Sequence, residues 1–140
     1  MPDINKWTPH VLAILRIVTA LLFLEHATMK FFAFPAAIPG VSYPLPAIML
    51  VAGIIELITA LLLTVGYFTR IAAFVASGEM AVAYWLAHGS QSFWPALNMG
   101  EPAILFCFVF LYLAFAGPGI WALDTNLRPF GAKTSKIARG

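Results

Sequence analysis

The chain has 140 residues, the length of one ordinary domain, yet only 10% of them are charged while 61% are hydrophobic. Soluble domains carry about 25% charged residues, so this composition excludes an ordinary soluble protein and indicates an all-α integral membrane protein. The formal net charge of +2 is too small and too scattered for nucleic-acid binding, and a single cysteine excludes an intrachain disulfide.

Four apolar segments follow one another and predict four membrane-spanning helices, at about residues 11–32, 47–65, 71–88 and 101–117. A helix needs roughly 20 residues to cross the hydrocarbon core. Gly66 is expected to end the second helix and Thr69 to cap the third. We therefore expect one membrane domain over residues 1–140, with a proline-rich loop at 33–46 and a basic tail at 125–140.

The placement of lysine and arginine predicts how the bundle is oriented. With four spans both termini share one side of the membrane, and that side holds Lys6, Arg70 and the four basic residues of the tail. Cytoplasmic loops are enriched in these residues. The fold class expected from the sequence is therefore an all-α integral membrane four-helix bundle with both termini cytoplasmic.

The first predicted helix carries Glu25, His26 and Lys30 at the end of its apolar run. Ionisable residues within the membrane are costly and are usually paired or functional. His26 and Lys30 are four residues apart and share a face with Arg16, whereas Glu25 points about 100° away. Arg16 lies near the start of the helix, where its charge could instead extend to the membrane surface.

The second and third helices each carry a glutamate near the middle. Glu56 and Glu79 lie on faces of small residues that allow close helix packing, so both are expected to point into the bundle. Glu56 is expected to have His26, Lys30 or Arg16 as its partner. Without a cationic partner, Glu79 would favour its neutral form in a low-dielectric interior.

Two further ionisable residues complete the group, since Glu101 opens the fourth helix and His88 ends the third. With the expected topology, four carboxylates, two histidines and one lysine converge on the outer half of the bundle. Plain structural pairing of these charges is the alternative. Glu101 also fits a helix start, because residues 98–101 resemble a capping box. No Glu-x-x-His di-iron pattern, phosphate-binding loop or catalytic triad motif is present, and no metal site is predicted.

Several of these features recur together in one known pattern: Arg16, the His26–Lys30 segment, Glu56, the Gly66–Arg70 turn, Glu101 and the closing Gly117–Asp124 segment. In this combination the sequence resembles the DoxX family of small four-span bacterial membrane proteins over nearly all of residues 11–124. Ala27 and Ala122 depart from the pattern, which has glycine and serine there. The resemblance implies a multi-pass protein of the bacterial inner membrane. The family is similar to the small subunit of archaeal thiosulfate:quinone oxidoreductase, although that functional label is an association.

The leading hypothesis is a redox-linked membrane subunit, an oxidoreductase component that handles a quinone or small reductant in the polar outer half of the bundle. Its catalytic group would be Glu56 and Glu79 as proton carriers with His26 as a hydrogen-bond donor, and its substrate-binding group Lys30, Glu25, Glu101, Arg16 and Tyr112. A quinone is the candidate cofactor. Besides the lipid bilayer, a membrane or soluble redox partner subunit and a second copy of the chain remain open as partners. The rival hypotheses are a non-catalytic accessory or assembly protein and a small proton-coupled transporter.

Overall fold

A computed structural model describes residues 4–126 of the chain, and those residues form helices and connecting loops without any strand. A short 3-10 turn η1 (Ile4–Trp7) leads into α1 (Thr8–Phe32). The helix begins three residues before the predicted span. Pro9 lies in its first turn, where a backbone N–H has no helical partner to lose.

Helix α2 (Ala47–Val65) has the predicted bounds and ends as expected at Gly66. Gly66 adopts a left-handed conformation with φ of 69°, and its N–H donates to the carbonyls of the last turn. Helix α3 (Thr69–Ala83) follows after a short turn and continues into a π-helical turn η2 (Tyr84–His88). The predicted cap at Thr69 is wrong, because Phe68 is the residue that precedes the helix and Thr69 is already its first helical residue.

The last part of the described chain contains α4 (Pro95–Asn98), α5 (Glu101–Ala116) and α6 (Leu123–Asn126). The predicted capping box before α5 is wrong. Asn98 ends α4, and its side-chain oxygen accepts a hydrogen bond from the N–H of Gly100 at 2.8 Å. The basic tail expected at 125–140 lies, from residue 127 onward, outside the described residues.

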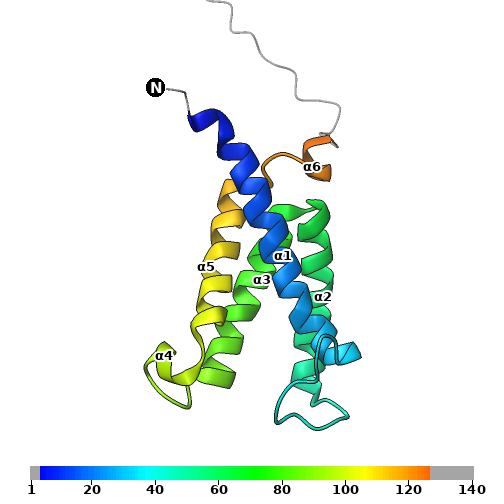
Figure 1. Cartoon of the computed structure of the whole chain (residues 1–140), viewed down its shortest axis with the longest axis vertical. Coiled ribbons are helices and arrows are strands. Elements are labelled where there is room, and N and C mark those ends of the chain that lie inside the picture. The colour runs from blue at the N-terminus through cyan, green and yellow to red at the C-terminus, as the bar shows by residue number, and fades with distance from the viewer. Residues whose placement is uncertain (1–3, 127–140) are drawn as a thin grey trace, which may run out of the picture.

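Figure 1 shows that the start of α1 and helix α6 lie at one end of the molecule, called here the terminal end. The 33–46 connection and α4 lie at the opposite end, called the loop end. Helix α1 packs mainly on α2, and α3 packs mainly on α5, while α1 and α5 contact each other little. The bundle therefore consists of two helix pairs joined through α2 and α3.

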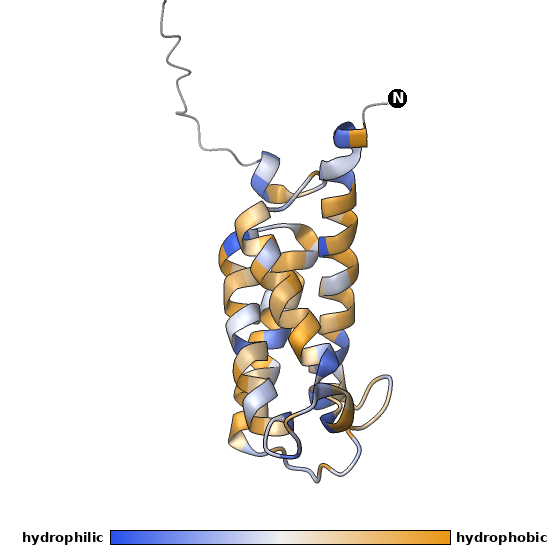
Figure 2. Cartoon of the chain, turned by 90° about the vertical axis from the view of Figure 1, so that its left-hand side faces the viewer, coloured by the Kyte–Doolittle hydropathy of each residue, from blue (hydrophilic) through white to orange (hydrophobic). Residues whose placement is uncertain are grey.

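The core between the helices is built from small and aromatic side chains. Alanines on α1, α2 and α3 are fully or almost fully buried, and Phe23 packs against Phe110 with ring centroids 4.8 Å apart. Small side chains let helix backbones approach closely, which is typical of packing within membranes. Outside this core the helices present mostly apolar residues, and the few strongly hydrophilic positions are scattered among them (Figure 2).

Length and composition identify three helices as candidate membrane spans, ending at Phe32, Val65 and His88. Only 28–33% of their most apolar stretches is buried inside the protein. The remaining apolar surface needs an apolar solvent, which a lipid bilayer provides. Helix α5 is apolar but shorter. The chain is therefore an all-α protein with several candidate membrane helices.

Candidate functional site

A buried ion pair joins α1 to α2. The ammonium of Lys30 lies 2.5 and 2.6 Å from the two carboxylate oxygens of Glu56. The Lys30 side chain is 10% exposed and that of Glu56 only 2%. Three partners were expected for Glu56, namely His26, Lys30 and Arg16, and the structure shows that Lys30 forms the ion pair. Removing either member would leave an uncompensated charge in the interior.

Gly53 makes room for this pair one turn before Glu56. A Cβ atom at Gly53 would lie 3.1 Å from Cδ of Lys30 and 2.9 Å from the ring of Phe31. Both approaches are closer than ordinary carbon contacts of about 3.5–4.0 Å. Gly53 is one of the small residues on the face of α2 that carries Glu56, and the structure shows that it lies against the stem of the lysine.

Glu79 lies beside the pair on α3, half-buried. Its Oε2 atom is buried and has no hydrogen-bond partner among residues 4–126. The charges that act on it are those of Glu56 and Lys30, while the ammonium of Lys30 is already bound to Glu56. A buried acceptor without a donor is costly, so this carboxyl group favours a proton or a donor group from a ligand. We call Lys30, Glu56 and Glu79 the polar site.

Of the seven ionisable residues expected to converge on the outer half of the bundle, Lys30 and Glu56 are joined by an ion pair and Glu79 lies within reach of their charges, whereas the other four have different surroundings. His26 is exposed one turn from Lys30, and its ring packs edge-on against Phe106 of α5, with centroids 5.7 Å apart. Glu101 is exposed at the start of α5. The remaining two have other surroundings: the Nδ1–H of the His88 ring donates a hydrogen bond to the Asn98 carbonyl at 2.9 Å, and Glu25 is exposed on α1.

Arg16 lies near the opposite end of the bundle and is completely buried, so its charge does not extend to the membrane surface. Its guanidinium donates to five backbone carbonyls, which belong to Leu63, Thr64, Pro118, Ile120 and Trp121. An arginine has five N–H donors, so the count of donors and acceptors matches. Arg16 therefore joins the end of α2 to the segment after α5.

Two more charged residues hold the terminal end. Arg70 donates to the carbonyls of Ala114 and Phe115 at 2.9 and 2.6 Å, near the end of α5. Asp124 accepts from the backbone N–H groups of Phe68 and Thr69 at 2.9 and 2.8 Å, and thereby caps α3.

These contacts also set the charge state of Asp124, which lies outside the candidate spans. Burial alone would raise its pKa, but the hydrogen bonds at the start of α3 and the nearby Arg16 charge hold the pKa below its ordinary value of 3.8. Asp124 therefore stays ionised at neutral pH and remains a strong acceptor. We call Arg16, Arg70 and Asp124 the terminal clasp.

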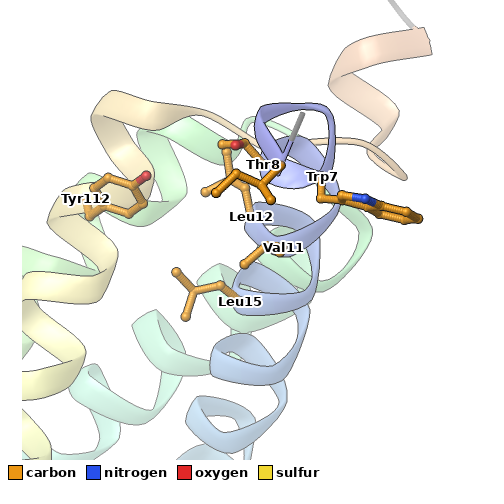
Figure 3. Close-up of a pocket in the computed structure, with 7 residues that line it drawn as sticks. Trp7, Thr8, Val11, Leu12, Leu15 and Tyr112 are labelled. Carbon is orange, nitrogen blue, oxygen red and sulfur yellow. The ribbon is translucent and has the colours of Figure 1, made fainter. Parts of the chain in front are cut away.

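Tyr112, predicted to bind substrate, lies on α5 toward the terminal end. It lines a groove of about 390 Å³ between α1 and α5, together with residues such as Trp7 and Leu15 (Figure 3). The groove is predominantly apolar and contains none of the three residues of the polar site. The structure thus separates Tyr112 and Arg16 from Lys30, Glu56 and Glu79.

Sequence reasoning missed a second polar contact in the core. The hydroxyl of Ser77 donates to the carbonyl of Cys107 at 2.8 Å and lies 3.6 Å from its sulfur. A serine within an alanine-rich helix face gave no signal of this partner. Within residues 4–126, no three His, Cys, Asp or Glu side chains come together in a group that could hold a metal ion.

Comparison with known proteins gives two matches. The DoxX family model matches residues 11–89. A protein of Haemophilus influenzae described as uncharacterized is 44% identical over 133 residues, which cover 90% of this chain and 97% of that protein. No solved structure matches the chain.

Proposed function

The chain belongs to the DoxX family, and from this premise we propose that it is a redox-linked membrane subunit whose polar site binds a quinol and accepts its first proton. The observation that supports this most is the buried Oε2 atom of Glu79, which has no donor among the described residues. A hydroxyl group of a quinol would supply both the missing hydrogen bond and a proton.

The charges of the polar site favour a neutral donor over an anion. Lys30 is the single cation of the site, and Glu56 occupies it through both carboxylate oxygens. An anionic ligand would meet two carboxyl groups and one lysine that is already paired. A quinol is uncharged, and its apolar ring and tail suit the surrounding apolar helices.

The roles that we propose follow from these contacts. Glu79 accepts the first proton of the quinol, and Glu56 holds Lys30 in place and can take part in proton transfer. Lys30 keeps a third N–H for the ligand, since an ammonium has three donors. His26 borders the site on the α5 side and would contact the second oxygen. Oxidation of the quinol releases two protons and two electrons, and the electrons pass to an electron carrier in a partner subunit.

The alternative is a non-catalytic accessory protein in which the ion pair only fixes the register of α1 against α2. The satisfied geometry of Lys30 and Glu56 fits that role equally well. It leaves Glu79 unexplained, because an apolar residue at that position would fill the same space without an unpaired acceptor. Glu79 is therefore the residue that separates the two functions.

The first test is the identification of the ligand. The full chain is purified in mild detergent, its lipids are extracted, and quinones are quantified per chain, with Glu101→Gln as a matched control that removes an exposed carboxylate. We expect a quinone in both the parent protein and the control, and its loss in a Glu79→Leu variant. An extract without quinone, together with no thermal shift on adding a short-chain quinol, would contradict the proposal.

We further propose that α5 crosses the membrane as a fourth span and that both termini are cytoplasmic, which places the polar site in the outer half of the bundle. The excess of basic residues at the termini supports this orientation. In a variant with Cys107 replaced by alanine, an impermeant thiol reagent should label a cysteine at position 90 from outside the cell and should not label one at position 135. The reverse pattern would place the polar site toward the cytoplasm.

A further inference from the structure

Glu25 is an exposed carboxylate on the side of α1 that faces away from the rest of the protein. It is nine residues from Arg16, or two and a half helical turns, and so points in the opposite direction from that buried side chain. The one ion pair found among residues 4–126 joins Lys30 to Glu56, so Glu25 has no such partner there. In a monomer this carboxylate would face lipid.

The position of Glu25 along α1 places it within the hydrocarbon. Helix α1 has 25 residues, and Glu25 is seven residues before its end. At about 1.5 Å per residue the helix is roughly 37 Å long, and a core of about 30 Å centred on it ends roughly 4 Å from each helix end. Glu25 lies roughly 10 Å from the nearer end and thus about 6 Å inside the core. Charged residues at this depth face a partner or a water-filled space rather than lipid.

An apolar seam on the exposed surface of α1 ends at Glu25, and its first two residues also line the groove between α1 and α5. Its exposed residues are alternately four and three positions apart in the sequence. This is the heptad spacing with which two helices pack side by side. These residues are Val11, Leu15, Val18, Leu22 and Glu25. His26, which is exposed next to Glu25, borders the same seam.

We propose that a second copy of the chain packs on this seam, so that Glu25 of each copy meets His26 of the other. Two copies in a membrane share one orientation, and a two-fold axis along the membrane normal brings each residue to the same depth in both. Because Glu25 and His26 are adjacent, the acceptor of one copy is level with the ring of the other to within one helical rise. The two adjacent residues Glu25 and His26 of one copy are therefore complementary to the same two residues of the other copy.

This charge pattern favours a copy of the chain over a different membrane protein. Another protein would need its own donor at the same depth, whereas the symmetric copy always supplies one. Lys30 is five residues from Glu25 and points about 140° away from it around α1, so the ion pair of the polar site does not lie on the seam, whereas His26 borders both.

Disulfide cross-linking in native membranes tests the proposal. In a Cys107→Ala background, Leu22→Cys places a thiol on the seam, and Ile58→Cys places one at a similar depth on the exposed face of α2 as a matched control. Oxidation should convert most of the Leu22→Cys protein into a covalent dimer and leave the Ile58→Cys protein monomeric. Equal cross-linking of the two variants, or none at Leu22→Cys, would overturn the proposal.

An exchange of the two residues tests the pairing itself. Glu25→His or His26→Glu alone should weaken association roughly 3- to 30-fold, the range typical of one interhelical hydrogen bond in a membrane. The double variant restores the pair and should recover the parent level of cross-linking. Unchanged association in both single variants would contradict the contact. A long and a short form of the Leu22→Cys protein are then co-expressed, so that a dimer of the chain gives products of three expected masses. A product whose mass fits none of these three would assign the seam to a different protein.

Discussion

The two ends of the bundle treat buried charge in opposite ways. In the terminal clasp, every donor of Arg16 has a carbonyl acceptor, and both carboxylate oxygens of Asp124 accept backbone N–H groups. In the polar site, one ion pair is complete, but the neighbouring Glu79 keeps a buried oxygen without a donor. The charged groups of the clasp are therefore satisfied within the protein, whereas the polar site keeps an unsatisfied acceptor, on which the proposed binding rests.

The difference follows from where the charges stand along the helices. The last carbonyls and the first N–H groups of a helix have no partner within it. Arg16 and Arg70 meet such carbonyls at the ends of α2 and α5, and Asp124 meets such N–H groups at the start of α3. Backbone groups in the middle of a helix are already bonded. Glu56 and Glu79 stand at such positions and need side-chain partners, but the polar site offers their two carboxyl groups one ammonium, that of Lys30 in the last turn of α1.

The largest effect is expected from breaking the clasp at its centre. Arg16→Met removes five hydrogen bonds to backbone carbonyls, of which that of Leu63 keeps a second donor in the N–H of Gly66, and hydrogen bonds to charged groups contribute about 1.5–3 kcal/mol each. We expect a loss of more than about 4 kcal/mol, measured as a failure to elute as a monodisperse protein in detergent. Arg16→Lys keeps the charge but has only three donors, so its stability should lie between that of the parent protein and that of Arg16→Met. A stable Arg16→Met variant would contradict a structural role for this residue.

A smaller loss is expected when the ion pair of the polar site is broken on one side. Lys30→Met leaves Glu56 buried without its counter-charge and should cost about 3–5 kcal/mol, seen as a lower melting temperature. The double variant Lys30→Met, Glu56→Leu removes both charges and should recover most of that stability. It should not recover quinol binding. Recovery of both properties would assign the pair to the fold alone.

The cap on α3 offers the mildest test of the clasp. Asp124→Ala removes an acceptor from two N–H groups and should cost about 0.5–2 kcal/mol. Because the folded pKa of Asp124 is lowered, its contribution is complete above the unfolded pKa near 3.8 and is lost as pH falls through the folded pKa. The difference in melting temperature between the parent and Asp124→Ala should therefore be constant near neutral pH. It should decrease toward zero as the pH falls below 3.8. A difference that persists in acid would show that packing, rather than the cap, is responsible.

Local patterns in the sequence predicted the helices and the inward direction of the Glu56 side chain. The small residues around Glu56 fixed its inward direction, and Gly66 marked the end of α2 because its conformation has a simple local cause. The role of Arg16 was not predictable. Its acceptors are backbone carbonyls that carry no residue-specific signal and lie far away in the chain. Which of the ionisable residues contact one another was not predictable either, because membrane depth alone does not specify the side of a helix, as the exposed Glu25 shows.

The measurement that tests the contrast most directly uses Glu79→Gln, because glutamine keeps the shape of a protonated glutamate but cannot accept a proton. Melting temperature is measured on the purified variant, and oxidation of a short-chain quinol, with ferricyanide as the electron acceptor, is measured in membranes of cells that express the same variant. We predict an unchanged melting temperature and a loss of quinol oxidation, whereas Glu101→Gln keeps both. Full activity in Glu79→Gln would remove Glu79 from proton transfer and contradict the proposed function, and a large fall in melting temperature would show that its carboxylate is a structural partner like those of the terminal clasp.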